Sequence, residues 1–141
     1  MNQKNPNICL AHTLRRADRV VNQLYNEHLA PVGLRVTQFT ILRTLALTGT
    51  TTASQIRTTL VMDQTTVSRA LKPLIRDGYI TVGEGANKRE KALSLSAEGK
   101  KLYQQALGPW GDAQKMLRKK LAGGQEDILI KLSREIVAMK G

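Results

Sequence analysis

The sequence is poor in residues that build covalent frameworks, and it has no long apolar run. A single cysteine, Cys9, excludes an intramolecular disulfide framework and is typical of a reducing compartment. No apolar stretch approaches the roughly 20 residues of a membrane span, and residues 1–6 lack the apolar segment of a signal peptide. We therefore expect a cytoplasmic protein that does not contact a membrane.

Residues that carry catalytic or metal chemistry are equally scarce. The two histidines, His12 and His28, fall on one predicted helix, with no Asp or Cys at metal-ligand spacing. The chain has no phosphate-binding P-loop, no G-x-S-x-G nucleophile motif and no paired carboxylates in an apolar setting. These absences predict a protein that is not an enzyme, needs no cofactor and holds no metal.

Basic residues outnumber acidic residues by two to one. The 141 residues include 22 Lys and Arg against 11 Asp and Glu, a net charge of +11. This balance favours a polyanionic partner, most commonly nucleic acid. The excess is spread evenly, at +4, +4 and +3 over residues 1–52, 53–101 and 102–141. Charge alone therefore predicts attraction to DNA, without predicting that a base sequence is read.

Both ends of the chain carry long helical patterns. Apolar residues recur at spacings of three and four over roughly residues 7–30, up to Pro31 and Gly33, and again over about residues 125–139. The stripe on the first of these helices is narrow and long, which is typical of a helix that pairs with another helix. The two terminal helices could together form a two-fold dimer platform that holds two DNA-reading heads.

Two shorter helices are predicted in the middle of the chain. Thr37 can cap one that runs to about residue 46, and Thr51 or Thr52 can cap another near residues 53–59. At this length and 41% hydrophobic content, the chain can bury a real core, as one domain or as a domain with arms.

The helix that follows Asp63 has two faces of different chemistry. Asp63 is a strong N-cap, and Gly78 stands where a left-handed residue ends a helix. One face is apolar and holds Val67, Ala70, Leu71, Leu74 and Ile75. The opposite face carries, at helical spacing, Thr65, Arg69, Lys72 and Arg76.

The exposed face of this helix suits the reading of bases in a DNA major groove. Gln can bind adenine through two hydrogen bonds, Thr can contact a thymine methyl, and Arg suits guanine or a phosphate. Short side chains near the helix start would let it reach the groove floor. The candidate DNA-binding residues are Gln64, Thr65, Thr66, Ser68, Arg69, Lys72 and Arg76. The alternative is an ordinary amphipathic helix with a polar outer face.

Two alternating segments, residues 80–82 and 93–95, predict antiparallel strands joined by a basic loop. Gly83 and Gly85 would permit the turn and a close approach of the backbone to DNA. Lys88 and Arg89 could contact phosphates, and Arg89 could enter the adjacent minor groove. Lys91 is a weaker candidate. The alternative is a solvated loop with incidental charge, which the nearby residues Glu84 and Glu90 favour.

The sequence after the second strand predicts a helix that is interrupted in its middle. Ser96 can cap a helix that runs toward residue 105, with Glu98 well placed in its first turn. Residues 108–111, Gly-Pro-Trp-Gly, predict a kink or break before the helix resumes over residues 113–121. Gly123 and Gly124 mark a turn before the last helix.

Three segments together resemble MarR-type winged helix-turn-helix regulators, over about residues 10–121. The first is residues 29–34 (LAPVGL) with Gln38 and Phe39. The second is residues 62–69 (MDQTTVSR) with residues 71–74 (LKPL). The third is residues 87–89 (NKR) followed by residues 93–99 (LSLSAEG). The helix-turn-helix alone is shared by many families, and the combination is specific.

The resemblance implies a mainly α fold with a small β-hairpin wing. It implies a dimerisation helix in residues 1–33, a DNA-binding domain in 34–100 and further dimerisation helices in 101–141. It also implies a homodimer on double-stranded DNA with a palindromic operator, and repression relieved by a ligand or an oxidant. Gln64–Arg76 would be the recognition helix and Arg89 the wing arginine.

Two positions depart from the family pattern. Asn87 stands where an Asp usually precedes the wing arginine by two residues, and a carboxylate there could orient the guanidinium. Gln64 stands where related sequences often have Arg, which would weaken a phosphate contact or shift the base preference.

Two routes of sensing are open. Cys9 lies near the start of the first helix, with Arg15 and Arg16 within two turns, and could respond to an oxidant; a free Cys is more commonly a small buried residue. A small aromatic or anionic inducer could instead bind among His12, Arg16 and Arg43, with Trp110 and Tyr25 as aromatic surface. These aromatics could equally pack in the core while the arginines face solvent.

Two other functions compete with a sequence-specific regulator. A non-specific basic architectural protein would coat nucleic acid, but its contact face would need Lys and Arg rather than hydroxyls. A winged helix that binds only protein would tolerate substitution of Arg69 and Arg89.

Overall fold

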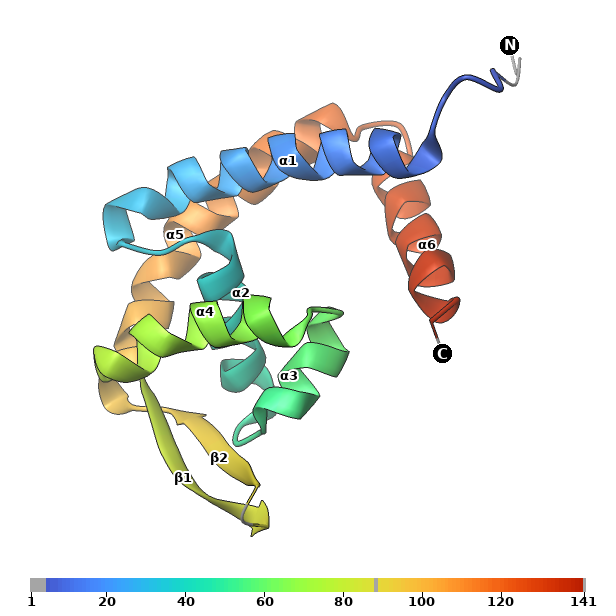
Figure 1. Cartoon of the computed structure of the whole chain (residues 1–141). Coiled ribbons are helices and arrows are strands. Elements are labelled where there is room, and N and C mark those ends of the chain that lie inside the picture. Colours follow the sequence, from blue (N-terminus) through green and yellow to red (C-terminus); the bar gives the residue numbers. More distant parts are fainter. Residues whose placement is uncertain (1–4, 88, 141) are drawn as a thin grey trace.

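The computed structural model describes residues 5–87 and 89–140. Over these residues the chain is mainly helical, with one hairpin of two antiparallel strands (Figure 1). The elements in order are α1 (Leu10–Leu29), η1 (Ala30–Val32), α2 (Val36–Thr48), α3 (Ala53–Leu60), α4 (Gln64–Arg76), β1 (Ile80–Asn87), β2 (Glu90–Leu95), α5 (Ala97–Lys120) and α6 (Gln125–Ala138). The predicted fold class, mainly α with a hairpin wing, is confirmed.

The two long helices α1 and α5 lie side by side, and the smaller elements form a head at one end of them (Figure 1). Only Tyr25 and Leu29 of α1 are buried, because the N-terminal part of this helix extends beyond the head. Gly33 adopts a left-handed conformation after η1, with φ of 75°, and turns the chain into α2. No helix in the described part of the chain is long and apolar enough to cross a membrane.

The predicted cap of α2 was wrong by two residues. The helix begins at Val36, and Arg35 occupies the N-cap position. Side chains outside the cap position satisfy the free amides: Gln38 Oε1 accepts from the Arg35 N–H at 3.0 Å, and Asn26 Oδ1 accepts from the Val36 N–H at 2.7 Å. The second contact comes from α1, so local sequence could not predict this boundary.

Thr52, one of the two predicted candidates, caps α3. Its Oγ1 accepts from the Gln55 N–H at 3.1 Å, while Gln55 Oε1 accepts from the Thr52 N–H at 3.2 Å. This reciprocal pair satisfies two amide donors that have no partner within the helix.

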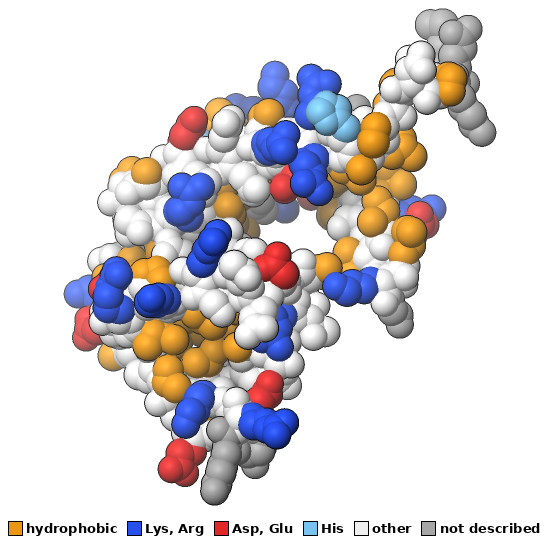
Figure 2. Space-filling view, in the orientation of Figure 1, with side chains coloured by type: hydrophobic (Ala, Val, Ile, Leu, Met, Phe, Trp, Pro, Cys, Tyr) orange, Lys and Arg blue, Asp and Glu red, His pale blue; other side chains and the backbone are white. Residues whose placement is uncertain are grey.

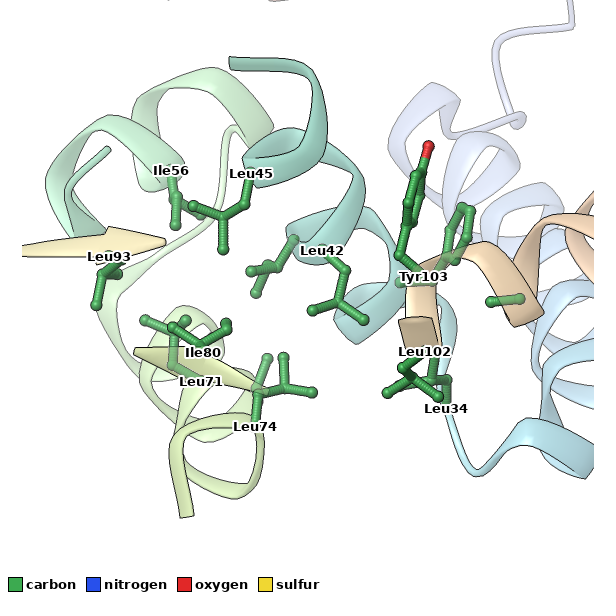
Figure 3. Packing of buried hydrophobic residues seen from close by; sticks show 14 of the residues in the cluster. Leu34, Leu42, Leu45, Ile56, Leu71, Leu74, Ile80, Leu93, Leu102 and Tyr103 are labelled. Carbon is green, nitrogen blue, oxygen red and sulfur yellow. The ribbon is translucent and has the colours of Figure 1, made fainter. Parts of the chain in front are cut away.

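One apolar core joins the head to the first turns of α5 (Figure 3). It runs from Leu29 to Ala106 and includes Phe39, Ile41 and Ile56, which are almost completely buried. All four α2 residues predicted to point inward are buried, namely Phe39, Ile41, Leu42 and Leu45. The division into residues 1–33, 34–100 and 101–141 stays a prediction, and the core crosses its boundary at residue 100.

The α5 helix is continuous through residues 108–111, so the predicted break does not occur. Packing on both sides of Pro109 outweighs the loss of one helical hydrogen bond there. Trp110 stacks on Phe39, with ring centroids 5.6 Å apart, and Ala106 and Ala113 are fully buried. The predicted turn at Gly123 and Gly124 is confirmed, since both residues have positive φ.

Candidate nucleic-acid interface

The start of α4 is fixed by Asp63, as predicted. Its Oδ1 accepts a hydrogen bond from the Thr66 backbone N–H at 2.7 Å. This bond favours the charged carboxylate and lowers the pKa of Asp63 below its ordinary value. At the other end, Gly78 has φ of 82°, which confirms the predicted left-handed residue. The helix is therefore held at both ends by the residues that the sequence indicated.

Four of the five predicted apolar residues of α4 face the core: Val67, Ala70, Leu71 and Leu74 are buried. The fifth residue of the predicted apolar face, Ile75, is 37% exposed. Ile75 lies in the last turn, on the flank that turns away from the core.

The opposite face of α4 is exposed to solvent. All seven predicted DNA-binding residues of the helix are exposed, namely Gln64, Thr65, Thr66, Ser68, Arg69, Lys72 and Arg76. Basic side chains gather over this helix in the space-filling view (Figure 2). A helix with this exposed chemistry can lie in a major groove, with hydroxyls and an amide near its N-terminus and cations toward its C-terminus.

Arg76 has an orienting partner that the sequence reasoning missed. Its Nε and Nη2 donate to the two carboxylate oxygens of Asp77, at 3.0 and 3.2 Å. The guanidinium lowers the pKa of Asp77, mainly through this hydrogen bonding. The signal was present in the sequence as two adjacent opposite charges, but the forked geometry required the backbone turn that ends α4.

The hairpin projects from the head beyond α4 (Figure 1). Its strands are longer than predicted, since β1 extends through most of the expected loop to Asn87. The pairing shifts register between Gly83 and Asn87. A Cβ at Gly85 would lie 1.7 Å from the Glu90 carbonyl oxygen, so this glycine permits close approach of the two strands.

Arg89 is exposed at the tip of the hairpin, and Lys91 is exposed on β2. Lys88, the other predicted wing contact, lies outside the described residues. Basic groups thus occur on both the helix and the hairpin, on the same face of the molecule (Figure 2). Basic groups in this arrangement can contact DNA phosphates from both the helix and the hairpin.

The predicted polar ligand contacts lie on two different helices, α1 and α2, and Cys9 precedes the first of them. Cys9 is exposed just before α1, and His12 and Arg16 are exposed on α1. Arg16 borders an open hollow of about 690 Å³, which His12 and Arg43 do not line. Within one chain, the three predicted pocket residues therefore do not line this hollow together.

Arg43 and the two aromatics take part in packing within the chain. The Arg43 guanidinium lies 4.8 Å from the centre of the Trp110 ring, and its Nη1 donates to the Tyr103 hydroxyl at 3.4 Å. The Tyr25 hydroxyl donates to Gln114 Oε1, and burial raises the pKa of Tyr25. In the described residues, no group of three or more His, Cys, Asp and Glu could hold a metal.

A three-helix head with a hairpin beside its exposed helix defines a winged helix-turn-helix. Residues 32–90 match the model of the MarR family. The chain is 32% identical over 96 residues to the uncharacterized HTH-type transcriptional regulator YwoH of Bacillus subtilis (strain 168), which covers 68% of this chain and 70% of YwoH.

Two solved structures show the same fold. The transcriptional regulator MosR of M. tuberculosis, in complex with DNA, is 29% identical, with a TM-score of 0.82 over 94% of this chain and 96% of MosR. BpsR of Bordetella bronchiseptica, whose structure concerns regulation of its DNA binding by 6-hydroxynicotinic acid, is 18% identical. Its TM-score is 0.81, over 96% of this chain and 98% of BpsR.

The chain belongs to the MarR family. It is a DNA-binding transcriptional regulator, and its relatives are regulators rather than enzymes.

Proposed function

We propose that this regulator is a homodimer that binds a palindromic operator and represses transcription until a small ligand or an oxidant releases it. Because a regulator of transcription needs access to the chromosome, we place it in the cytoplasm as part of the same proposal.

The observation that carries the dimer is the uncovered apolar surface of the terminal helices. The α6 helix has no buried residue, and it exposes Ile128, Leu129, Ile130, Leu132, Ile136 and Val137. At the same end of the molecule, α1 exposes Leu10 and Leu14 (Figure 1). An exposed apolar surface of this kind marks an interaction site, and a second copy offers the same surface in return.

In such a dimer, α4 of each head enters a major groove and each hairpin meets the adjoining minor groove. Heads about 34 Å apart would read successive turns on one face of B-DNA. Gln64, Thr65, Thr66, Ser68 and Arg69 near the start of α4 would contact bases. Lys72, Arg76, Lys88 and Arg89 would contact phosphates, with Arg89 also at the minor groove.

For release, we propose a small aromatic or anionic ligand that binds in the cleft between the dimer platform and the DNA-reading head, with His12, Arg16 and Arg43 as its polar contacts. The regulation of BpsR by 6-hydroxynicotinic acid supports this class of ligand. The oxidant route would act through Cys9, whose exposure makes its thiol accessible. If Cys9→Ser no longer releases DNA, release is assigned to the oxidant. If Arg16→Ala or Arg43→Ala no longer releases DNA, release is assigned to the ligand.

The deciding experiment is a fluorescence-anisotropy titration at physiological salt. DNA from upstream of the protein's own gene is compared with a shuffled duplex of equal length. A preference of about a thousandfold, at one dimer per site, supports an autoregulating sequence-specific regulator. Equal affinity, with a steep salt dependence for both duplexes, would support a non-specific architectural protein or an operator elsewhere.

The dimer is tested separately by light scattering of the purified chain. We expect the mass of two chains for the natural protein and a shift toward one chain for Leu132→Glu, which places a charge on the apolar face of α6. Lys131→Glu changes the charge of the neighbouring residue and is the matched control. A monomeric natural protein would refute the homodimer.

A further inference from the structure

An apolar trough runs between α4 and the hairpin, and DNA reading through polar residues does not explain it. We define the apolar trough by Leu71 and Ile75 of α4 and Val82 of β1. A hollow of about 490 Å³ follows this flank of α4, lined by Ser68, Leu71, Lys72, Ile75 and Arg76. Ile75 is 37% exposed and Val82 is 46% exposed. Figure 2 shows an apolar patch between the basic groups of the helix and those of the hairpin.

The strand register explains why Val82 faces this trough. Val82 pairs with Leu93, and Ile80 pairs with Leu95, so these four side chains share the face of the hairpin that meets the head. Ile80 and Leu93 are buried against the core. Val82 lies at the same level as Leu93 but on the other strand: Thr51 pairs with Leu93 and α3 contacts β2, whereas Val82 on β1 stays 46% exposed.

The α4 side of the trough is positively charged, while its floor carries no charge. Lys72 and Arg76 lie on α4, and Asp77 holds two of the five Arg76 donors in a fixed fork. The other three N–H donors of the Arg76 guanidinium are not used by Asp77. Beyond the trough, Lys91 is exposed on β2. The basic side chains therefore complement phosphates, and the uncharged floor of the trough complements an apolar group that lies between those phosphates.

We propose that the apolar trough receives the deoxyribose edge of the one DNA strand that separates the major groove from the minor groove. Ile75 and Val82 would then select against a 2′-hydroxyl at the sugar they contact. This inference rests on the proposed docking of α4 and the hairpin in adjoining grooves, because only a sugar–phosphate backbone lies between two such grooves.

The physical reason is the cost of an unpaired hydroxyl. Deoxyribose presents C–H groups, which an apolar floor can cover without loss. The 2′-hydroxyl of a ribose would lose its hydrogen bonds to water against Ile75 and Val82 and find no partner there. A thymine methyl is the other apolar group of DNA, but it belongs to the groove floor, where the first turns of α4 are expected.

The test uses a duplex that the protein itself enriches from a random-sequence library. Single ribonucleotides replace deoxyribonucleotides one position at a time, and affinity is measured by anisotropy. We expect about a tenfold loss at one or two adjacent sugars in each half-site and less than about threefold elsewhere. Replacing thymidines by deoxyuridines should leave the loss at those sugars unchanged.

Three variants assign the effect to the trough. Val82→Thr keeps the β-branched shape and adds a hydroxyl that can pair with the sugar, so the ribonucleotide penalty should fall below about threefold. Ile75→Ala should also reduce the penalty and provides a second variant at a helical position. Thr81→Val changes the opposite face of the same strand and should keep the natural profile.

The outcomes separate this proposal from the proposed function. If the library yields no preferred duplex, sequence-specific reading itself fails. If a duplex is enriched but every ribonucleotide has the same effect, or Val82→Thr keeps the natural profile, the deoxyribose contact is refuted while DNA reading stands. If affinity falls only where thymidine is replaced by deoxyuridine, a base methyl occupies the trough, and the proposal is also refuted.

Discussion

Gly99 of α5 packs directly against the backbone of Tyr79. A Cβ at Gly99 would lie 2.0 Å from the Tyr79 carbonyl oxygen and 2.9 Å from its carbon. The same carbonyl accepts a hydrogen bond from the Ser96 N–H at 3.1 Å. The chain just before β1 and the first turn of α5 therefore meet without room for a side chain, and this contact sets how the hairpin is joined to the head.

Gly99→Ala should lower the free energy of unfolding by about 2–3 kcal/mol, because a backbone carbonyl must move to admit the methyl group. The measurement is urea unfolding at a fixed protein concentration. Gly108→Ala on the same helix is the control, since no atom apart from its chain neighbours and nearby helix backbone lies within 4 Å of its Cβ position. It should be neutral or stabilising. Equal effects of the two substitutions would contradict the close packing at Gly99.

Val61 should be a source of backbone strain at the turn between α3 and α4. It is the only residue other than glycine with a positive φ in the described chain, at 53°, and its side chain is 46% exposed. A β-branched residue is unfavourable there, so Val61→Gly should raise the free energy of unfolding by about 1 kcal/mol. Val61→Ala, which keeps a Cβ, should recover less of this gain. Destabilisation by Val61→Gly, seen in thermal unfolding, would show that side-chain contacts of Val61 outweigh the strain.

The Asp63 cap should make the stability of the fold sensitive to acid. The folded-state pKa of Asp63 is lowered, chiefly by the Thr66 backbone hydrogen bond. Its contribution is therefore present above the unfolded pKa of about 3.9 and is lost as the pH falls through the lower folded value. Asn caps helices as well as Asp but does not titrate.

Asp63→Asn should match the natural chain near pH 7 and lose less stability between about pH 4 and pH 2, as followed by circular dichroism during heating. Other carboxylates titrate in both proteins, so the difference between the two curves isolates Asp63. Parallel curves over that range would exclude a charged cap.

Arg69 and Arg89 should affect DNA binding in different ways. Arg69→Ala removes a proposed base or phosphate contact and should weaken binding to a preferred duplex by about 1–3 kcal/mol. Arg89→Ala should reduce the slope of log affinity against log salt by about 1, because one fewer phosphate is neutralised. Arg134→Ala, on the exposed C-terminal helix α6, is the control for a general loss of charge. Unchanged affinity and slope in both variants would refute the proposed docking.

Local sequence determined most of the head and the exposed face of α4 that we propose reads DNA. Asp63, Thr52 and Gly78 were predicted at helix ends because a cap or a left-handed residue acts over one turn of chain. The exposed polar face of α4 followed from helical periodicity, which depends on spacing alone. The family resemblance rested on the same short segments.

Tertiary structure decided what no local pattern contains. Residues 108–111 stay helical because Trp110 stacks on Phe39, a residue 71 positions earlier in the chain. The start of α2 depends on Asn26 from α1. Ile75 was predicted only as part of the apolar face of α4, and Val82 only as part of a strand. The structure leaves both exposed, at 37% and 46%, on the neighbouring elements α4 and β1. Sequence spacing fixes which side chains share a face of an element, but only the packing of elements decides whether that face is covered.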